Sequence, residues 1–369
     1  MKSLQLKHII ILASIILYWS NSFANTPTPI DEDATAETKE LFNALYSLQG
    51  EKILFGHHNS NISGKTFDHT GTDICDESDL LTSVGDYPAI FSFDFYSGFD
   101  EILPQVQKAA ELGGIITICY HIESGNGDTS WSKNHDRTTR YVKEVLPVGK
   151  NHNYLKAELD KIADFASRAK TKDGTLIPII FRPWHEHTGA WFWWGTATST
   201  PEEYCQLWQF TVDYLINTKG VHNFLYALSP SRPTKSYEIR NPGAEYIDIA
   251  AFDCYENDKL FAANFIKSAQ VTVEYAQKHK KIAASAEFGC QKGIANSTNP
   301  DWYITELLEP ILADPLAQKL AYIATWRNYK TIYWIPLQGD PHYNSFKKFH
   351  NNKRILFRNE WQTLKKERI

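Results

Sequence analysis

The sequence of 369 residues lacks several features that identify common classes of protein. Its 38 Lys and Arg residues are scattered along the chain among 43 Asp and Glu residues, which gives a formal net charge of −5. A nucleic-acid partner is therefore not expected, because phosphate backbones are bound by clustered basic side chains. No Gly-rich phosphate-binding fingerprint follows an early predicted strand, and we expect no cofactor.

The sequence also lacks any C-x-x-C pair of cysteines. Such pairs are typical of zinc sites and of thiol–disulfide centres. Three cysteines lie in or next to strongly apolar runs, where a reduced thiol packs as a small hydrophobic group. We expect mostly free, buried thiols, whereas an exported protein usually forms disulfides, and an odd number leaves at least one thiol outside any internal pair. The five are Cys75, Cys119, Cys205, Cys254 and Cys290.

The N-terminal apolar run is too short to span a membrane. It extends over 11 residues from Ile9 to Trp19, whereas a spanning helix needs roughly 20. Two lysines precede the run, and a small-x-small cleavage sequence that ends at Ala24 follows it. We interpret residues 1–24 as a signal peptide and residues 25–35 as a polar spacer. The mature protein is then expected to be exported to the periplasm or secreted, without a membrane anchor.

No Gly-, Ser- or Pro-rich linker interrupts the rest of the chain, so residues 36–369 are interpreted as one domain. Short apolar runs alternate there with longer amphipathic segments. Each run is almost continuously apolar, as in strands covered on both faces, and each ends in polar or aromatic residues. The eight runs are 52–58, 88–96, 113–121, 176–186, 223–230, 246–255, 281–289 and 321–328.

The segments between the runs have the apolar spacing of helices, most clearly in 154–170, 201–220 and 264–280. Eight β–α repeats predict an α/β fold of the (β/α)8 or TIM-barrel type, in which the C-terminal ends of the strands build the active site. An open doubly wound sheet is the alternative. The tail, residues 329–369, is expected to fold back over the barrel mouth and to end in a helix.

Aromatic residues are abundant and are concentrated in one stretch. They make up 14% of the chain, which is more than a core of this size needs, and this favours a ligand-binding surface suited to sugars. The stretch FRPWHEHTGAWFWWG, residues 181–195, surrounds Glu186 with aromatic side chains. Its histidines do not form the zinc motif H-E-x-x-H, because Gly189 stands at the second histidine position. No metal is therefore expected.

Two glutamates end predicted strands on the same rim of the barrel. Glu186 ends the fourth run, and Glu287, in SAEFG, ends the seventh. Glycoside hydrolysis needs two carboxyl groups beside one bond, and a separation of about 5–5.5 Å permits a retaining mechanism through a covalent intermediate. Aromatic neighbours desolvate the Glu186 carboxyl and raise its pKa, as a general acid requires. The alternative for each glutamate is a helix cap or a charge on the rim.

The stretch RPWHEHTGAWFWWG resembles the signature of glycoside hydrolase family 26, and the resemblance extends from about Lys52 to the C-terminus. FGHH, YHIESGNG, FDCY and TWRN, in the first, third, sixth and eighth runs, are also similar to family motifs. The resemblance implies a retaining β-1,4-mannan hydrolase with Glu186 as acid/base and Glu287 as nucleophile. It further implies that the reacting sugar contacts His121, His185, Trp191, Tyr255 and Trp326.

These implied roles agree with the chemistry of the side chains. An indole such as Trp326 can stack on the apolar face of a sugar, and the Tyr255 hydroxyl can donate to the nucleophile. Arg182 is interpreted as structural, orienting and neutralising carboxylates. For His57 and His58, a sugar contact and a buried core pair both remain open.

The third run departs from the family pattern. Many members continue it as W-H-x-x-N-P, whereas this chain has YHIESGNGDTSW and an insertion that extends to about Lys150. A loop of this length on the catalytic face is commonly functional. Trp131, Lys133 and Arg137 are its candidate residues for closing the non-reducing end of the cleft.

We therefore expect a monomeric enzyme that acts on β-mannan or manno-oligosaccharides. Cleavage inside the polymer and release of mannobiose from chain ends both remain open. The same mechanism on xylan or mixed-linkage β-glucan is an alternative. A carbohydrate-binding protein without turnover is a rival of another class, but it would need only the aromatic residues and would not need the two glutamates.

Overall fold

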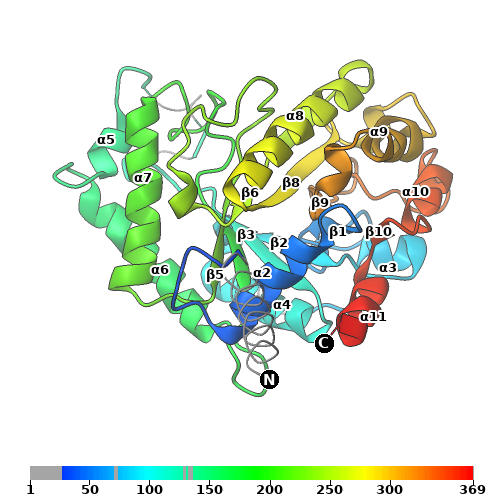
Figure 1. The fold of residues 1–369 in the computed structure, drawn as a ribbon, viewed down its shortest axis with the longest axis horizontal. Helices are drawn as coiled ribbons and strands as arrows, with labels where there is room; N and C mark the ends of the chain where they lie inside the picture. Colours follow the sequence, from blue (N-terminus) through cyan, green and yellow to red (C-terminus); the bar gives the residue numbers. More distant parts are fainter. Residues whose placement is uncertain (1–26, 70–73, 128–129, 132–135, 369) are drawn as a thin grey trace, which may run out of the picture.

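The computed structural model describes residues 27–69, 74–127, 130–131 and 136–368. The expected signal peptide and the first two residues of the expected spacer lie outside the described residues. The structure is built around a closed ring of parallel strands (Figure 1), in which β9 pairs with both β8 and β1. The predicted barrel is thus confirmed, and the open sheet is wrong. The ring consists of β1 (Ile53–His58), β2 (Ile90–Asp94), β3 (Ile115–Cys119), β4 (Ile179–Arg182), β5 (Phe224–Leu228), β6 (Ile249–Ala250), β8 (Ile282–Cys290) and β9 (Tyr322–Thr325).

The sixth predicted strand is interrupted. It forms β6 and then β7 (Asp253–Glu256), and both pair with β8. In this register Asp253 lies opposite Glu287. A short strand that the sequence did not predict, β10 (Ile355–Leu356), pairs with the start of β1.

The amphipathic segments form helices around the barrel (Figure 1). The three clearest predictions correspond to α6, to α7 with the π-helical turn Tyr214–Thr218 that follows it, and to α8. The start of α7 has a capping box, in which Thr200 and Glu203 bond each other's backbone N–H groups. The helices are α3 (Asp79–Val84), α4 (Phe99–Glu111), α5 (Tyr141–Val145), α6 (His152–Arg168), α7 (Pro201–Asp213), α8 (Asp258–His279), α9 (Glu309–Ala313) and α10 (Tyr343–His350).

Two further helices, α2 (Ala36–Leu48) and α11 (Arg358–Arg368), lie at the N-terminal end of the barrel. Apolar residues of α2, including Phe42 and Leu45, form one buried cluster with Trp361 of α11 and with strand residues such as Leu54. These helices therefore close that end of the barrel with apolar packing. The sequence analysis did not predict α2.

The tail follows the prediction in part. Near its start, Trp334 donates from Nε1 to the carbonyl of Cys290 at the end of β8, 3.0 Å away. The tail then continues to β10 and to α11, which is the expected final helix but lies at the N-terminal end of the barrel. Only the first part of the tail thus approaches the barrel mouth.

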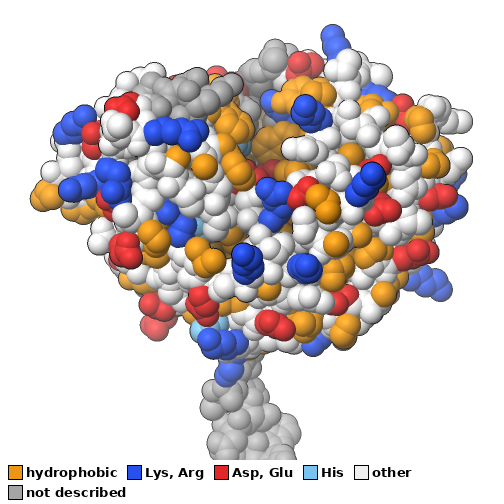
Figure 2. Space-filling view, turned by 90° about the horizontal axis from the view of Figure 1, so that it is seen from above, with side chains coloured by type: hydrophobic (Ala, Val, Ile, Leu, Met, Phe, Trp, Pro, Cys, Tyr) orange, Lys and Arg blue, Asp and Glu red, His pale blue; other side chains and the backbone are white. Residues whose placement is uncertain are grey.

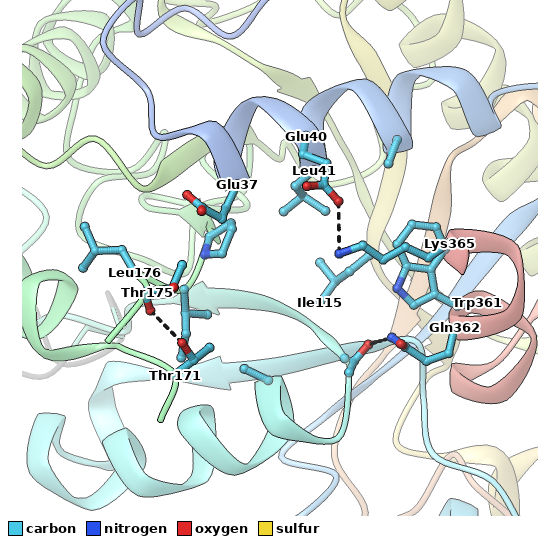
Figure 3. A pocket seen from close by; sticks show the side chains of 16 residues that line it. Glu37, Glu40, Leu41, Ile115, Thr171, Thr175, Leu176, Trp361, Gln362 and Lys365 are labelled. Carbon is cyan, nitrogen blue, oxygen red and sulfur yellow. Dashed lines mark hydrogen bonds and ion pairs between the residues drawn. The ribbon is translucent and has the colours of Figure 1, made fainter. Parts of the chain in front are cut away.

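A hollow of about 270 Å³ lies between α2, α11 and the chain before β3 and β4 (Figure 3). Lys365 of α11 pairs with Glu40 of α2 at 3.2 Å across it, above Ile115 and Trp361. Because Ile115 begins β3, this hollow is at the opposite end of the barrel from the strand termini that carry the predicted glutamates. It is therefore separate from the candidate active site.

The described part of the expected spacer packs on the barrel. The Ile30 N–H donates to Asp248 at 2.8 Å, and Asp31 pairs with His222 at 2.9 Å. All five cysteines lie in the described residues as free thiols, and all but Cys205 are buried, as predicted. Among the described residues, no helix is long and apolar enough to cross a membrane.

The packing around Phe55 generates a test of the core. Its ring lies 4.8–6.4 Å, centre to centre, from four other phenylalanine rings in β8, α10 and the chain after β10. We expect Phe55→Ala to lower the free energy of unfolding by about 3–5 kcal/mol, because it leaves a cavity among these rings. Leu81→Ala, at a half-exposed position in α3, should cost less than about 1 kcal/mol. Urea unfolding measures both, and similar losses would contradict the packing described.

Candidate active site

The turn after β4 and the strand β8 bring Glu186 and Glu287 to the C-terminal end of the barrel. Glu287 lies within β8, and Glu186 lies in a turn beyond the last residue of β4, so neither is the terminal residue of its strand as predicted. Burial and the charge of Glu287 both raise the pKa of Glu186, so the two carboxyl groups lie close enough to interact. The structure thus places both predicted carboxyl groups at one site.

The turn that carries Glu186 has an unusual backbone. Trp184 and Glu186 have φ angles of +51° and +53°, in the left-handed region that non-glycine residues seldom adopt. The conformation costs about 1–3 kcal/mol for each such residue. It is held by the Glu186 N–H, which donates to the Ser229 carbonyl at 2.7 Å, and by Trp194, whose indole donates to the His185 carbonyl at 2.8 Å. These two hydrogen bonds therefore fix the position of Glu186 despite the strain.

The carboxyl group of Glu186 has an aromatic hydrogen-bond partner. Its half-buried carboxyl accepts a 2.6 Å hydrogen bond from the indole Nε1 of Trp191. Burial, together with the charge of Glu287, raises the pKa of Glu186 to about 7, against smaller lowering effects from Trp191, Arg182 and His121. Near neutral pH this carboxyl can therefore both donate and accept a proton.

Glu287 has polar and charged partners instead. Arg182 bonds its Oε1, and the Tyr255 hydroxyl donates to its Oε2 at 3.0 Å. Arg182 also pairs with Asp253 at 2.9 Å, and Asp253 accepts from the Ser229 hydroxyl at 2.6 Å. Arg182 thus has the predicted structural role, because it orients the Glu287 carboxylate while its own buried charge is neutralised by two acids.

The five side chains expected around the reacting sugar come together at this end of the barrel. Trp191 and Tyr255 bond the two glutamates, as described above. The ring of His121 lies 4.6 Å from His185 and 6.0 Å from Trp326, centre to centre. All except His185 are partly exposed. Their contact with a sugar remains a prediction.

His57 and His58 occupy core positions. Both are buried, and burial lowers the pKa of His57 to about 3 and that of His58 well below its usual value. The His58 ring stacks under Trp326 with ring centres 3.9 Å apart and an interplanar angle of 12°. One face of Trp326 is thereby covered. The core interpretation of the two histidines is thus the one that the structure favours.

Two aspartates of the site were not singled out in the sequence. Asp94 ends β2 and bonds His121, and Asp253 begins β7 and bonds Arg182. Both stand in runs already read as strands, in SFDFY and AFDCY. The rule that located the glutamates, an acid near the C-terminal end of a barrel strand, would have found both aspartates.

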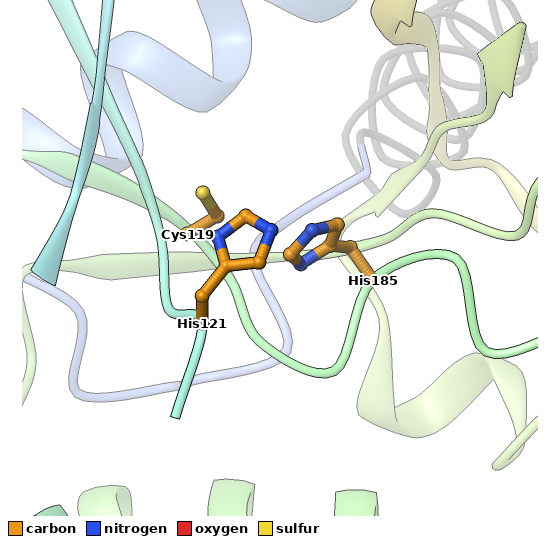
Figure 4. A group of neighbouring side chains, drawn as sticks. All are labelled: Cys119, His121 and His185. Atoms are coloured by element: carbon orange, nitrogen blue, oxygen red, sulfur yellow. The ribbon is translucent and has the colours of Figure 1, made fainter. Parts of the chain in front are cut away.

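Cys119, His121 and His185 converge as if to bind a metal (Figure 4). One ring nitrogen of His121 is already engaged by Asp94, and burial raises the pKa of the Cys119 thiol well above its usual value. We interpret the three side chains as a wall of the cleft, in which Asp94 holds the imidazole of His121.

Part of the long insertion reaches the edge of the site. Trp131 is 45% exposed, and its ring lies 5.0 Å from Phe192 and 6.2 Å from His121, centre to centre. Lys133, another predicted residue of this loop, lies outside the described residues. Trp191 also lines a hollow of about 280 Å³, together with polar side chains that include Arg232 and Asn264.

The surface agrees with the charge pattern of the sequence. Figure 2 shows the Lys and Arg side chains scattered among acidic ones, without a continuous basic band on the face drawn. The molecule is hollowed near the upper edge of this view, where hydrophobic side chains lie along the hollow.

Comparisons with known proteins agree with this geometry. The model of glycosyl hydrolase family 26 matches residues 30–297. A mannan endo-1,4-beta-mannosidase of Bifidobacterium adolescentis is 32% identical over 342 residues, which cover 84% of this chain and 33% of that protein. The chain thus spans about a third of the length of that relative. A Bacillus subtilis protein of the same name is 26% identical over 68% of this chain and 74% of its own length.

Solved structures show the same likeness. A double mutant of the Cellulomonas fimi endo-beta-1,4-mannanase matches with a TM-score of 0.84 and 35% identity, covering 91% of this chain and 78% of that chain. A beta-mannanase from Bacteroides ovatus matches with a TM-score of 0.80 and 33% identity, covering 88% of this chain and 96% of that chain.

The raised pKa of Glu186 generates a test that needs no substrate. Because the folded protein holds this proton more tightly than the unfolded chain, the free energy of unfolding should fall as pH rises from about 4.5 to about 7. Glu186→Gln cannot ionise. Above pH 7 it should be more stable than the wild type by on the order of 2 kcal/mol, and at pH 4 the two should be alike.

Urea unfolding at pH 4, 6 and 8 measures this difference. Glu274→Gln, at an exposed position of α8, is the matched control and should differ from the wild type by the same amount at each pH. A pH-independent difference between Glu186→Gln and the wild type would show that the pKa of Glu186 is not raised.

Proposed function

The chain belongs to glycosyl hydrolase family 26, and from that premise we propose that it is a retaining hydrolase of β-1,4-mannan. The observation that carries the proposal is the contrast between its two carboxyl groups. Glu186 has a pKa of about 7 in an aromatic environment, and Glu287 is held by Arg182 and Tyr255. An acid that exchanges its proton near neutrality and an oriented carboxylate are the two groups that a retaining glycosidase needs.

In the first step Glu287 attacks the anomeric carbon while Glu186 donates its proton to the glycosidic oxygen. The C–O bond to the leaving sugar breaks, and the sugar remains on Glu287 as an ester. The ester has no charge, so the effect of Glu287 that raises the pKa of Glu186 is lost. Glu186, now ionised, accepts a proton from water as the water oxygen attacks the anomeric carbon. The bond between that carbon and the Glu287 oxygen breaks, which releases the sugar and restores the Glu287 carboxylate.

The choice of mannan rests on the names of the relatives. The free face of Trp326 offers a platform for a pyranose ring, and the polar hollow beside Trp191 can accommodate the leaving sugars. Xylan and mixed-linkage β-glucan would use the same carboxyl groups. Binding without turnover would leave the pairing of Glu186 and Glu287 without a role.

We further propose that the protein acts outside the cytoplasm. The support is the N-terminal pattern of a signal peptide cleaved after Ala24. N-terminal sequencing of the mature protein from culture fluid and periplasm tests the location and the cleavage site together.

Substitution of the two glutamates should separate their roles. Glu287→Ala should lower kcat/KM by on the order of 10⁴-fold or more on every substrate, because the covalent intermediate cannot form. Glu186→Ala should be slow on mannan yet form the intermediate readily from a dinitrophenyl β-mannobioside, whose leaving group needs no proton. Azide should then restore turnover, giving the β-azide with Glu186→Ala and the α-azide with Glu287→Ala.

Product analysis by chromatography with NMR of the anomeric proton measures these outcomes. The same azide anomer from both variants, or equal losses on both substrates with Glu186→Ala, would contradict the assignment of roles.

We propose that the enzyme cleaves bonds inside the polymer, because the relatives are named as endo-acting mannosidases. Digestion of a long galactomannan should then lower its viscosity strongly for each reducing end formed. If the insertion that carries Trp131 closed the non-reducing end of the cleft, mannobiose would be the main early product and viscosity would fall slowly. Parallel viscometry and reducing-end assays distinguish the two modes.

A further inference from the structure

Asp94 makes a set of contacts that the proposed mechanism leaves without a role. Its Oδ2 bonds the Nδ1 of His121 at 2.5 Å. Its Oδ1 accepts from the backbone N–H of His121 at 3.1 Å and from that of Tyr96 at 2.9 Å. Both oxygens are thus engaged, and one residue fixes both the main chain and the imidazole of His121.

We propose that Asp94 is a positioning residue for glycoside hydrolysis, which holds His121 in one orientation and as an imidazolium in the wall of the reacting-sugar site. The inference rests on the proposed function. What it adds to that function is an indirect role for Asp94, which acts on the reaction through the orientation and the charge of the His121 ring.

The contacts of the His121 ring explain how Asp94 can control its orientation. Its ring meets His185 edge to face, at a centre-to-centre distance of 4.6 Å and an interplanar angle of 80°, and Figure 4 shows it pointing toward that residue. It also lies 5.2 Å from Phe192. The side chains of His121 and Asp94 are 14% and 10% exposed. A ring so enclosed takes its orientation from its neighbours, and Asp94 supplies the hydrogen bond to its Nδ1.

The charges around the pair favour a proton on His121. Burial opposes the charged ring, but Asp94 raises the pKa of His121 by charge and hydrogen bond, and Glu287 adds to this, so that the pKa is raised above its usual value. Burial lowers the pKa of His58 and of His185, so those rings are neutral. The titratable and charged groups that face the pair come from several strands: His58 of β1, Cys119 of β3, Tyr120 beyond β3, Arg182 of β4, His185 and Glu186 beyond β4, Glu287 of β8 and Arg327 beyond β9.

The charge on His121 has a consequence at the acid/base. A positive ring lowers the pKa of Glu186 and therefore opposes the effects of burial and of Glu287. The first step needs Glu186 protonated, so kcat/KM falls as pH rises through that pKa. Without Asp94, His121 is neutral, the pKa of Glu186 rises, and the alkaline limb of the pH profile moves to higher pH. A purely structural contact would not move that limb.

Asp94→Asn separates these effects. The carbonyl of the substituted amide can still accept from both backbone N–H groups, but its NH₂ group donates to Nδ1 and the carboxylate charge is lost. We expect kcat/KM on mannopentaose to fall by about 10- to 100-fold, the range found when the carboxylate that orients a metal-bound histidine is lost. We also expect the alkaline limb to move up by on the order of half a pH unit. Asp94→Glu, which restores the charge, should return the limb toward its wild-type position.

Asp248→Asn is the matched control. Asp248 is also buried and accepts two backbone N–H bonds, from Ile30 and from Tyr226, but at the N-terminal end of the barrel. It should lower thermal stability and leave the pH profile unchanged. A wild-type profile and rate for Asp94→Asn, or equal shifts in Asp94→Asn and Asp248→Asn, would overturn the proposal.

A second measurement covers the case in which Asp94→Asn does not fold. The imidazole ¹⁵N shifts of the wild-type protein, assigned by their loss in His121→Gln, should show both nitrogens of His121 protonated at pH 7. A neutral ring would overturn the proposal. Failure of this inference can be distinguished from failure of the proposed function. A wild-type protein that does not hydrolyse manno-oligosaccharides refutes the function. An active wild type with a neutral His121 refutes only the role of Asp94.

Discussion

The geometry of the site depends on the buried guanidinium of Arg182. Its side chain is 2% exposed, and an unpaired cation at such a position would cost several kcal/mol. Asp253 and Glu287 neutralise it from the neighbouring strands β7 and β8. Because one planar group bonds both carboxylates, β4 cannot shift relative to these strands without breaking an ion pair. The requirement to neutralise one charge thus sets the place and the orientation of Glu287.

The same cation makes two chemically identical side chains unlike each other. Glu287 bonds Arg182 and the Tyr255 hydroxyl, whereas the side-chain partner of Glu186 is the neutral indole of Trp191. Burial is therefore less compensated at Glu186, and the negative charge of Glu287 adds to it in raising its pKa. The raised pKa of Glu186 thus depends on the place of Glu287, which in turn depends on Arg182. The difference in environment is what allows one carboxyl group to transfer protons while the other forms a bond.

Much of the fold could be predicted from the sequence, because apolar runs and helical spacing are local patterns. Glu186 and Glu287 were located for the same reason, since acids near strand ends of a barrel meet on one rim. The partners of these residues depend on register and on distant contacts. Asp253 faces Glu287 only because the sixth strand is interrupted, and the left-handed backbone of Glu186 is held by Ser229 beyond β5. α2 was missed because its apolar face is buried by strand residues and α11, far away in the chain.

The strained turn of Glu186 and the buried ion pairs of Arg182 lie at the C-terminal end of the barrel, and they lower the stability of the folded state. The apolar cluster that α2 and α11 form with strand residues extends from the other end into the barrel, as far as Ala286 of β8, and its packing offsets this cost. Shared strands connect the two ends: β1, for example, carries Leu54 of that cluster and His58, which supports Trp326. A loss of packing at the N-terminal end would therefore affect catalysis through the global stability of the barrel. Loss of the Arg182 side chain would instead remove a partner of the Glu287 carboxylate directly.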